Sequence, residues 1–307
     1  MSLMLFGIAR NMWFRCKYEP TFDERKIPTK ARPSQMKKEY MELCKTEINT
    51  LLQKKLIRPS RSPWSCSAFY VNKNAEIERG VPRLEINNKP LNEALQWIRY
   101  PVPNKKDLLD RLQDAVIFSK FDMKSDYWQV QITENDRYKI AFTVPFGHFE
   151  WNVMPFGLKN APSEFQHIMN DIFNPYTEFA ICYIDDVLIF SSSIDQHMKH
   201  LNIFKHVISR NGLVVSVPKM KLFQTTVRFL GHNIHNGTII PINRSMEFAS
   251  KFPDEIKDKT QLQRFLGSLN YIHDYYPNLA TDAAVLYSRL HKNPPVWGPE
   301  HTSAVKK

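Results

Sequence analysis

Apolar residues recur at helical spacing in two stretches of the first two-thirds of the chain. In residues 34–56 they occur every three or four positions, which predicts a helix that ends before Pro59 and Pro63. A second helix is expected to begin at Asn160 and Pro162, because Asn caps helices and Pro suits their first turn. The side chains expected on its buried face are Phe165, Ile168, Met169, Ile172 and Phe173.

Two further helices are expected in the C-terminal third. One covers about residues 194–210, and its expected buried side chains are Met198, Leu201, Phe204 and Ile208. About the last 65 residues become helical in pattern, and Thr260 with Gln263 forms a capping box ahead of a second helix. The apolar residues of that helix are Leu262, Phe265, Leu266, Leu269 and Ile272.

Shorter apolar runs bounded by turn residues predict strands. In chain order they cover residues 68–71, 116–121, 128–132, 138–144, 149–154, 179–184, 187–190, 213–217 and 227–234. Residues 1 to about 30 carry little pattern and are interpreted as an N-terminal extension. The chain therefore has the pattern of an α+β protein followed by a small helical module.

Composition and charge indicate the class of partner. The chain has 307 residues, of which 43% are hydrophobic and 12% aromatic, as in globular proteins. Its formal charge of +11 indicates a polyanionic partner. Basic residues gather in clusters with aromatic residues and Pro between them, which favours a nucleic-acid channel, although charge alone leaves open a basic surface that serves solubility. The clusters are residues 26–38, 54–61, 105–106, 219–221 and 251–259.

The cysteines and the apolar runs indicate an intracellular protein. Cys16, Cys44, Cys66 and Cys182 are irregularly spaced and form no Cys-x-x-Cys pair, which predicts reduced thiols rather than a disulfide frame or a zinc knuckle. No apolar run reaches transmembrane length, and the short run 3–9 has no basic region before it, so neither a membrane span nor a signal peptide is expected. The expected compartment is the cytosol or the nucleus.

Two histidine pairs have the spacing of metal ligands. They are His197 with His200 and His232 with His235. Neither pair has cysteine or carboxylate residues at matching spacing. Solvated histidines are therefore the favoured interpretation.

Asp185 and Asp186 stand between two apolar runs. Apolar flanks predict buried strands, yet burying an unpartnered charge is costly. A tight hairpin would place the pair at a sheet edge, where a divalent cation can compensate it. Asp122 follows the apolar run 116–121, and if that strand neighbours the hairpin, the three carboxylates form the usual ligand set for two-metal phosphoryl transfer. A surface turn for the pair and a capping role for Asp122 remain alternatives.

Several long motifs around these aspartates resemble the reverse transcriptases of retroelements. They are FDMKSDYWQV at 121–130, PFGHFEWNVMPFGLKNAP at 145–162 and YIDDVLIFS at 183–191. RFLGH at 228–232 and QLQRFLGSLNY at 261–271 are similar to plant pararetroviruses of the caulimovirus type, including copies integrated in plant genomes. The resemblance covers about residues 30–295, in the family's order and spacing.

The resemblance implies an α+β right-hand polymerase with fingers, a palm with an antiparallel sheet, and a helical thumb. After the extension of residues 1–30, residues 31–115 would be mainly fingers. Residues 116–240 would be mainly palm, with a fingers excursion at about 133–155, and residues 241–307 would be the thumb. The chain stops at Lys307, before any RNase H domain of such a protein.

The same resemblance assigns the metal ligands and a gate for the sugar. Asp122, Asp185 and Asp186, with the backbone carbonyl of Met123, would hold two Mg²⁺ ions, for which Mn²⁺ could substitute. Tyr127 would stack under the deoxyribose and leave no room for a 2′-hydroxyl. Ordinary core packing is the alternative for Tyr127.

The resemblance also implies residues that contact the nucleotide and the primer, because they stand at the matching positions of the family's motifs. Arg83 would stack on the incoming base and pair its triphosphate, with Lys89 six residues on, since a planar guanidinium suits both tasks. Phe156 and Gly157 would line the nucleotide pocket, and residues 229–231 (Phe229, Leu230, Gly231) would grip the primer. Lys219 resembles a lysine proposed as the general acid for pyrophosphate, and a solvated lysine is its alternative.

The implied activity is RNA-directed and DNA-directed DNA synthesis by a polymerase of the kind that viral polyproteins contain, and the sequence does not determine whether this chain is expressed alone or cut from a polyprotein. Its partners would be an RNA or DNA template, a DNA or tRNA primer and deoxynucleoside triphosphates, with no membrane. It would act in the cytoplasm or within viral particles. A metal nuclease that uses the same carboxylates is disfavoured, because the motifs offer no positioned base or histidine to activate water. The sequence does not determine the oligomeric state.

Three residues depart from the family pattern. Asp126 stands where relatives usually carry Gly or Ala, and a carboxylate there would repel a triphosphate. Glu85 replaces an expected apolar residue, and Asn88 replaces an expected aromatic one. The alternative function is therefore a catalytically impaired endogenous viral relic that binds primer–template but polymerises poorly.

Overall fold

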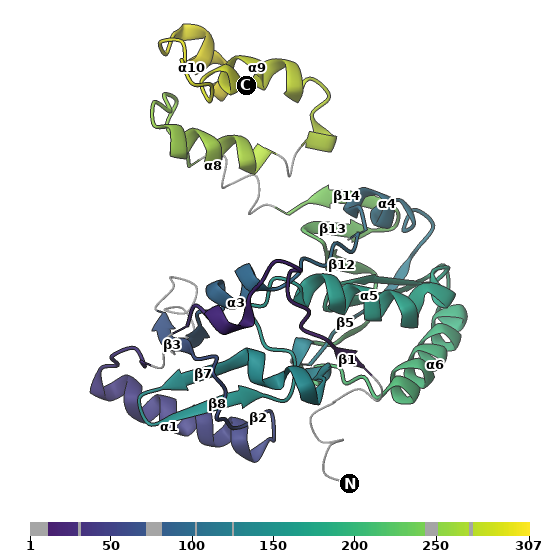
Figure 1. Cartoon of the computed structure of the whole chain (residues 1–307). Helices are drawn as coiled ribbons and strands as arrows, with labels where there is room; N and C mark the ends of the chain where they lie inside the picture. The colour runs from purple at the N-terminus through teal and green to yellow at the C-terminus, as the bar shows by residue number, and fades with distance from the viewer. Residues whose placement is uncertain are drawn as a thin grey trace. The chain divides into compact units, whose positions relative to one another are not determined.

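The computed structural model describes residues 12–29, 32–71, 82–101, 103–124, 126–242, 251–269 and 273–307. The chain divides into two compact units. The first unit comprises residues 1–104 and 119–223, and the second comprises residues 105–118 and 224–307. Each unit combines helices and strands (Figure 1). The α+β class predicted from the sequence is confirmed.

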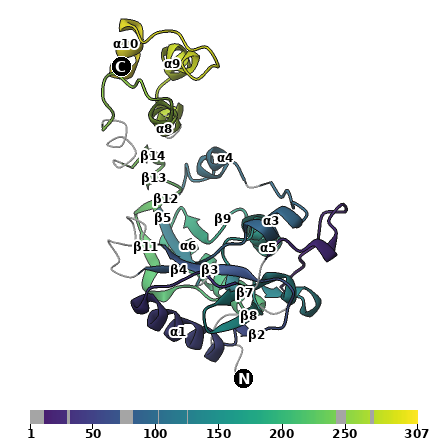
Figure 2. The same ribbon diagram turned by 60° about the vertical axis from the view of Figure 1, so that its left-hand side comes forward.

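A five-stranded sheet forms one part of the first unit. Its strands follow the order β2 (Ile57–Pro59), β8 (Gly147–Trp151), β7 (Ala141–Val144), β3 (Cys66–Val71) and β4 (Arg83–Ile86). β3 and β7 run parallel, and the other neighbours are antiparallel. Helix α1 (Lys38–Gln53) lies beside β2, β7 and β8 in both views (Figures 1 and 2), and it confirms the helix expected at 34–56 with shorter ends. The short helix α3 (Lys89–Ala94) follows β4.

The other part of the first unit is a four-stranded sheet. Its strands follow the order β11 (Lys221–Gln224), β5 (Ile117–Asp122), β10 (Asp186–Ser191) and β9 (Ala180–Tyr183). Helix α5 (Ala161–Phe173) packs on β9, and helix α6 (Ile194–Asn211) packs on β10. The apolar face expected for α5 is confirmed, since Phe165, Met169 and Phe173 are buried. α6 begins at its cap Ser193 and ends at Gly212, which has a left-handed conformation.

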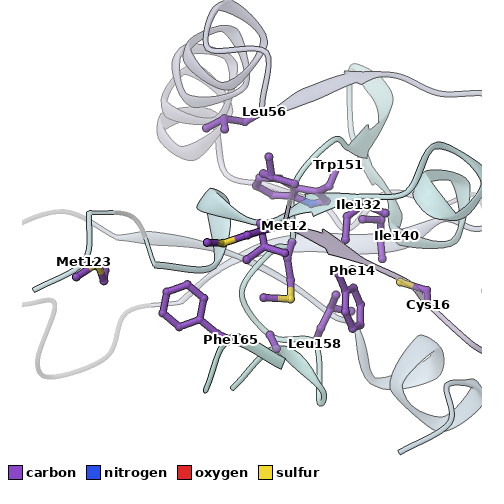
Figure 3. Packing of buried hydrophobic residues seen from close by; sticks show 14 of the residues in the cluster. Met12, Phe14, Cys16, Leu56, Met123, Ile132, Ile140, Trp151, Leu158 and Phe165 are labelled. Carbon is purple, nitrogen blue, oxygen red and sulfur yellow. The ribbon is translucent and has the colours of Figure 1, made fainter. Parts of the chain in front are cut away.

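The segment interpreted as an N-terminal extension contributes to the core of this unit. Strand β1 (Trp13–Phe14) pairs in parallel with β6 (Gln131–Ile132). Met12, Phe14 and Cys16 are buried, and Figure 3 shows them near Trp151, Ile132 and Leu158. All four cysteines are buried free thiols. Burial raises the pKa of Cys44 to about 11 and that of Cys66 to about 12.

The second unit contains a three-stranded meander and helices. The strands are β12 (Thr226–Phe229), β13 (His232–His235) and β14 (Thr238–Pro241), all antiparallel. The helices are α4 (Lys105–Asp110), α8 (Lys259–Leu269), α9 (Leu279–Ser288) and α10 (Pro299–Lys306). Ile256, Leu262, Phe265, Leu266, Ala283 and Leu286 form the core of the C-terminal helices. Within the described ranges, none of the helices is both long and apolar enough to cross a membrane.

Several predicted strands are wrong in whole or in part. In the predicted strand 128–132, only Gln131–Ile132 (β6) is a strand, and the residues before it belong to the 3₁₀ helix Asp126–Gln129. In the predicted strand 138–144, only Ala141–Val144 (β7) is a strand, and the residues before it belong to the 3₁₀ helix Glu134–Ile140. The run 213–217 provides a single bridge, Met123 to Val215. The run 227–234 is a hairpin rather than one strand, because Leu230 and Gly231 form its turn with φ of 48° and 86°. Apolar content alone does not distinguish these conformations.

Two helix details are also corrected. Thr260 and Gln263 do not form the capping box, because α8 already starts at Lys259 and Asp258 accepts the backbone N–H of Gln261 at 2.7 Å. Met198 is half exposed at 49%, whereas His197 on the same helix is fully buried. Ile272, expected on α8, lies outside the described residues.

Candidate active site at the β9–β10 hairpin

The two adjacent aspartates lie at the tip of a tight hairpin. Tyr183 pairs with Asp186, so Ile184 and Asp185 are the two central residues of the turn. The favoured two-residue hairpin turns require positive φ at the first central residue, and Ile184 has a φ of 55°. A β-branched residue is strained there, and such strain persists only where neighbours enforce it.

Gln166 of α5 supports this turn. Its side chain is fully buried, and Oε1 accepts the Ile184 backbone N–H at 2.6 Å. Its amide nitrogen donates to Asn170 Oδ1 at 2.8 Å and to the Cys182 carbonyl at 3.4 Å. Asn170 in turn donates to the Tyr100 hydroxyl at 2.9 Å. The helix therefore holds the strained hairpin through side-chain hydrogen bonds.

The end of β5 lies directly against this hairpin. The backbone N–H of Met123 donates to the Asp185 carbonyl at 2.9 Å. On the other side, the N–H of Ser216 donates to the Asp122 carbonyl at 2.8 Å. These backbone bonds bring Asp122 next to Asp185 and Asp186, which are more than 60 positions away along the chain.

The three carboxylates influence one another electrostatically. Burial raises the pKa of Asp185 above its ordinary value, the charges of Asp186 and Asp122 raise it further, and Lys219 opposes this. Lys120 Nζ lies 2.9 and 3.0 Å from the two carboxylate oxygens of Asp186. Lys219 Nζ lies 2.9 and 3.2 Å from those of Asp122. Two ammonium groups thus compensate part of the negative charge.

The donor set fits a divalent metal ion, although the side chains are not gathered around one position. Among the residues with described placement, no group of three or more His, Cys, Asp or Glu side chains is arranged to hold an ion. The carboxylates supply the oxygen ligands that Mg²⁺ and Mn²⁺ prefer. The cations that contact these carboxylates in the structure are the ammonium groups of Lys120 and Lys219.

An aromatic cluster is built around Phe156. Tyr127 lies with its ring centroid 5.2 Å from that of Phe156 and 5.6 Å, edge on, from that of Phe165. The Arg83 guanidinium lies 5.3 Å from the Phe156 centroid. The Trp128 ring meets the Phe156 ring edge on, with 5.9 Å between the two centroids. The phenyl ring of Phe156 therefore contacts two separate segments of the sequence, Arg83 and the adjacent pair Tyr127 and Trp128.

Comparison with known proteins identifies the family. The family model for reverse transcriptase (RNA-dependent DNA polymerase) matches residues 71–234, more than half of the chain. This chain belongs to the reverse transcriptase family. The genome polyprotein of Petunia vein clearing virus (isolate Hohn) is 45% identical to this reverse transcriptase chain over 280 residues, which are 91% of the chain and 13% of the polyprotein. The enzymatic polyprotein of Cauliflower mosaic virus (strain NY8153) is 42% identical over 262 residues, 85% of the chain and 38% of that polyprotein.

These relatives confirm the caulimovirus type, and the chain spans 13% to 38% of their length. Solved structures support the fold. A foamy viral protease-reverse transcriptase in complex with dsDNA superposes with a TM-score of 0.81 at 20% identity, over 97% of this chain and 62% of that chain. The same kind of protein in complex with RNA/DNA hybrid gives a TM-score of 0.74 at 21% identity, over 90% of this chain and 37% of that chain. The predicted polymerase fold is confirmed.

In this reverse transcriptase, two asparagines hold the loop that carries Phe156 and Gly157. Asn88 is buried and its Nδ2 donates to the Phe156 carbonyl at 3.2 Å. Asn92 Nδ2 donates to the Gly157 carbonyl at 2.9 Å. Gly157 has a φ of 87°, and a Cβ there would lie 3.1 Å from Asn88 Nδ2. Asn88, a departure from the family pattern, thus has a structural role.

The other two departures from the family pattern are Glu85 and Asp126. Arg83 Nε lies 3.5 Å from Glu85 Oε1, so Glu85 pairs with the arginine expected to bind nucleotide. Both residues line a cavity of about 150 Å³ together with Trp128, Trp151 and Phe156. The side chain of Asp126 lies outside the described part of the structure.

The remaining expected site residues are not part of this cluster. Lys89 is exposed at the first residue of α3 and, in the part of the chain with described placement, does not enter the contacts around Phe156. Phe229, Leu230 and Gly231 belong to the second unit, where Phe229 is buried and the other two form the β12–β13 turn. Their roles remain predictions.

The histidine pair on α6 is not solvated as expected. His197 Nε2 lies 2.7 Å from Ser119 Oγ, and Nδ1 lies 2.9 Å from Ser191 Oγ. Ser191 Oγ also lies 2.8 Å from His200 Nδ1. Burial, and then the nearby charge of His200, lowers the pKa of His197 to about 4. His197 is therefore a neutral core residue near neutral pH.

Sequence reasoning missed Gln166, Lys120 and the loop-holding role of Asn88. The sequence could have indicated Gln166, since it is a polar residue within the apolar face of α5. It could also have indicated Lys120, because Lys120 lies two residues before Asp122 in a strand, and both side chains therefore lie on the same face. Asn88 had no local signal, since its partner lies 68 positions away.

Proposed function

We propose that this chain is an RNA-directed and DNA-directed DNA polymerase that adds deoxynucleotides to a primer 3′-end by two-metal phosphoryl transfer. Membership of the reverse transcriptase family supports the class of reaction. The observation that carries the proposal is the hydrogen bond between the Met123 and Asp185 backbones, which brings Asp122 near enough to Asp185 and Asp186 for their charges to raise the pKa of Asp185. An acidic cluster at the end of buried strands suits a phosphoryl-transfer site.

In this proposal Asp122, Asp185, Asp186 and the carbonyl of Met123 hold two divalent ions, normally Mg²⁺, with Mn²⁺ as a substitute. Ions held by these residues would supply activation of the primer hydroxyl and neutralisation of the triphosphate charge. The hairpin positions Asp185 through the bonds from Gln166 and Met123. Lys219, which is 65% exposed and paired with Asp122, would give a proton to the leaving pyrophosphate.

The cluster around Phe156 would bind the nucleotide. Tyr127 packs against Phe156 and Phe165 and would exclude a 2′-hydroxyl beneath the sugar. Arg83 would stack on the base and pair the triphosphate, assisted by Lys89, while Phe156 and Gly157 line the pocket. Primer–template, an RNA or DNA template with a DNA or tRNA primer, would be held by the basic residues that give the chain its charge of +11, and residues 229–231 would grip the primer. The setting would be the cytoplasm or a viral particle.

The test is primer extension on an RNA template with Mg²⁺. Asp185→Asn should reduce the extension rate by about 10³-fold or more, because a metal ligand loses its charge while its shape is kept. Asp171→Asn, the same change on the exposed surface of α5, should extend at the wild-type rate. Undiminished extension by Asp185→Asn would remove the proposed metal site.

The ion pair between Arg83 and Glu85 favours a second candidate, an impaired polymerase that holds primer–template but extends it slowly. A carboxylate 3.5 Å from Arg83 competes with the triphosphate for the guanidinium. Glu85→Leu should then lower the KM for deoxynucleotides by roughly 3- to 10-fold. Asp126→Gly should raise the extension rate. If neither change improves a slow wild-type enzyme, these residues do not impair it.

A further inference from the structure

Lys120 occupies an inner position beside the acidic cluster. β5 lies between β11 and β10 in the four-stranded sheet. Along β5, Ser119 and Phe121 are buried, whereas Lys120 and Asp122 alternate onto the other face. Lys120 reaches from this strand to the first residue of β10 and contacts both carboxylate oxygens of Asp186, at 2.9 and 3.0 Å.

The two lysines at the site are not equivalent. The side chains of Lys120 and Asp186 are 23% and 24% exposed, and both residues are held in paired strands. Lys219 is 65% exposed and lies in the 3₁₀ turn Val217–Lys219. A lysine on an exposed turn can leave its carboxylate at little cost. Lys120 cannot leave Asp186 as easily. Strand β5 fixes the position of its Cβ, and the surrounding residues shield the Lys120–Asp186 ion pair from water.

We propose that Lys120 is a fixed internal cation of the active site, which orients Asp186 and limits how strongly the acidic cluster binds divalent metal. It is a positioning residue, since it acts through Asp186. The inference rests on the proposed function, because it takes the three aspartates as metal-binding residues. With Lys120 in place, the three carboxylates and this ammonium carry a net charge of −2 rather than −3, and Lys219 is the cation that yields when metal binds.

Two effects of opposite direction are expected when the charge is removed. Lys120→Met keeps most of the aliphatic stem but leaves the cluster more negative, so metal should bind more tightly. The same change frees the Asp186 carboxylate from its bidentate contact, so the maximal rate of primer extension should fall. A side chain with a merely structural role would not lower the metal dissociation constant.

The first measurement is Mn²⁺ binding to the full chain without nucleic acid, followed by the electron paramagnetic resonance signal of free Mn²⁺. Lys120→Met should lower the dissociation constant roughly 3- to 10-fold. Lys120→Arg, which keeps the charge, should stay near the wild-type value. Lys205→Met, which removes the same charge from an exposed position of α6, should also leave it unchanged. Lys120→Gln takes the place of the Met variant if thermal melting shows that variant to be unfolded.

Unchanged or weaker Mn²⁺ binding by the charge-removing variant would overturn the role of Lys120. The second measurement is the Mg²⁺ dependence of primer extension, where the half-saturating concentration should fall together with the maximal rate. A wild-type chain that binds Mn²⁺ but extends no primer would contradict the proposed function, while the binding titration would still test Lys120. Normal wild-type extension with no shift in binding would contradict the Lys120 inference alone.

Discussion

Asn88 and Asn92 show at the scale of single residues how the loop that carries Phe156 and Gly157 is held. Each donates its amide N–H to a backbone carbonyl of the loop, at 3.2 Å to Phe156 and 2.9 Å to Gly157. The Asn88 bond is partly buried, and a buried carbonyl that loses its hydrogen-bond partner costs about 1–3 kcal/mol. The position of the Phe156 ring, and with it the contacts of Arg83 and Tyr127, therefore depends on these amides.

Asn88→Asp tests this dependence. The change keeps the shape of the side chain but replaces the donor by an acceptor that faces the Phe156 carbonyl, so the loop should shift. We expect the KM for deoxynucleotides to rise by roughly 3- to 10-fold with a smaller change in kcat, measured by single-nucleotide incorporation. Asn87→Asp, the same change at the exposed neighbouring residue, is the control. Equal KM values for wild type and Asn88→Asp would refute the role of the amide.

His197 is a second residue whose chemistry is set by its surroundings. It is fully buried between Ser119 and Ser191, with the ring of Phe223 at 5.3 Å and His200 as the titratable neighbour. Because its pKa in the fold is about 4, below the ordinary 6.5, the unfolded chain binds more protons between these values. The stability that neutral His197 contributes is present above pH 6.5 and is lost as pH falls toward 4.

The expected outcome is a decrease in the free energy of unfolding on acidification, on the order of 1–3 kcal/mol from this residue between pH 6.5 and 4. Urea unfolding followed by circular dichroism at several pH values would measure it. His197→Gln should flatten the pH dependence. His206→Gln, at an exposed position of the same helix, should preserve it. A His197→Gln variant with the wild-type slope would contradict the assignment.

At the scale of elements, the meander of the second unit has two tight turns with the same backbone requirement. Leu230 and Gly231 join β12 to β13 with φ of 48° and 86°, and Asn236 and Gly237 join β13 to β14 with φ of 45° and 74°. Two positive φ values are the mark of type I′ hairpins, whose twist matches that of the strands. The two glycines differ in their surroundings. A Cβ on Gly237 would lie 2.5 Å from the Gln113 carbonyl oxygen, whereas nothing lies within 4 Å of one on Gly231.

The two glycines form a matched pair of tests. Gly231→Ala should cost about 1 kcal/mol of unfolding free energy, because Ala is strained at positive φ. Gly237→Ala should cost about 2–3 kcal/mol, because the contact with Gln113 adds to that strain. Hydrogen exchange of the β13 and β14 amides would report both values within the same unit. Equal costs would show that the Gln113 carbonyl moves aside freely.

At the scale of the whole molecule, the charge of +11 is the relevant property. A polymerase meets a different template sequence at every step, so its affinity for nucleic acid should depend on contacts with phosphates rather than with base edges. Binding of that kind releases counterions and weakens steeply with salt. The charge therefore predicts how affinity responds to solution conditions, although it does not identify the phosphate contacts.

We expect the affinity for a primer–template duplex to fall on the order of 100-fold or more between 50 and 200 mM monovalent salt. Fluorescence anisotropy with labelled duplexes of two unrelated sequences would measure the slope, which should be the same for both. A salt-independent affinity, or a strong preference between the two sequences, would contradict a channel that binds mainly phosphates.

The sequence by itself determined the local elements with strong periodicity and the motif residues. Helices α1, α5 and α6 and the β9–β10 hairpin follow from the spacing of apolar residues, because that spacing directly reflects which face is buried. The Asp pair at the hairpin tip could be predicted for the same reason. The apolar residues on both sides of the pair favour burial, whereas the two charged carboxylates disfavour it, so the pair is expected at the edge of the sheet.

Only the tertiary structure decided which residues from distant segments meet. His197 rather than Met198 faces the core, because Ser119 and Ser191 supply its hydrogen bonds from two other elements. The run 227–234 turns back at Leu230 because pairing of β12 with β13 stabilises a conformation that Leu alone disfavours. Lys120 and Asn88 likewise find partners more than 60 positions away. Such pairings are set by the packing of the whole unit, which local periodicity cannot report.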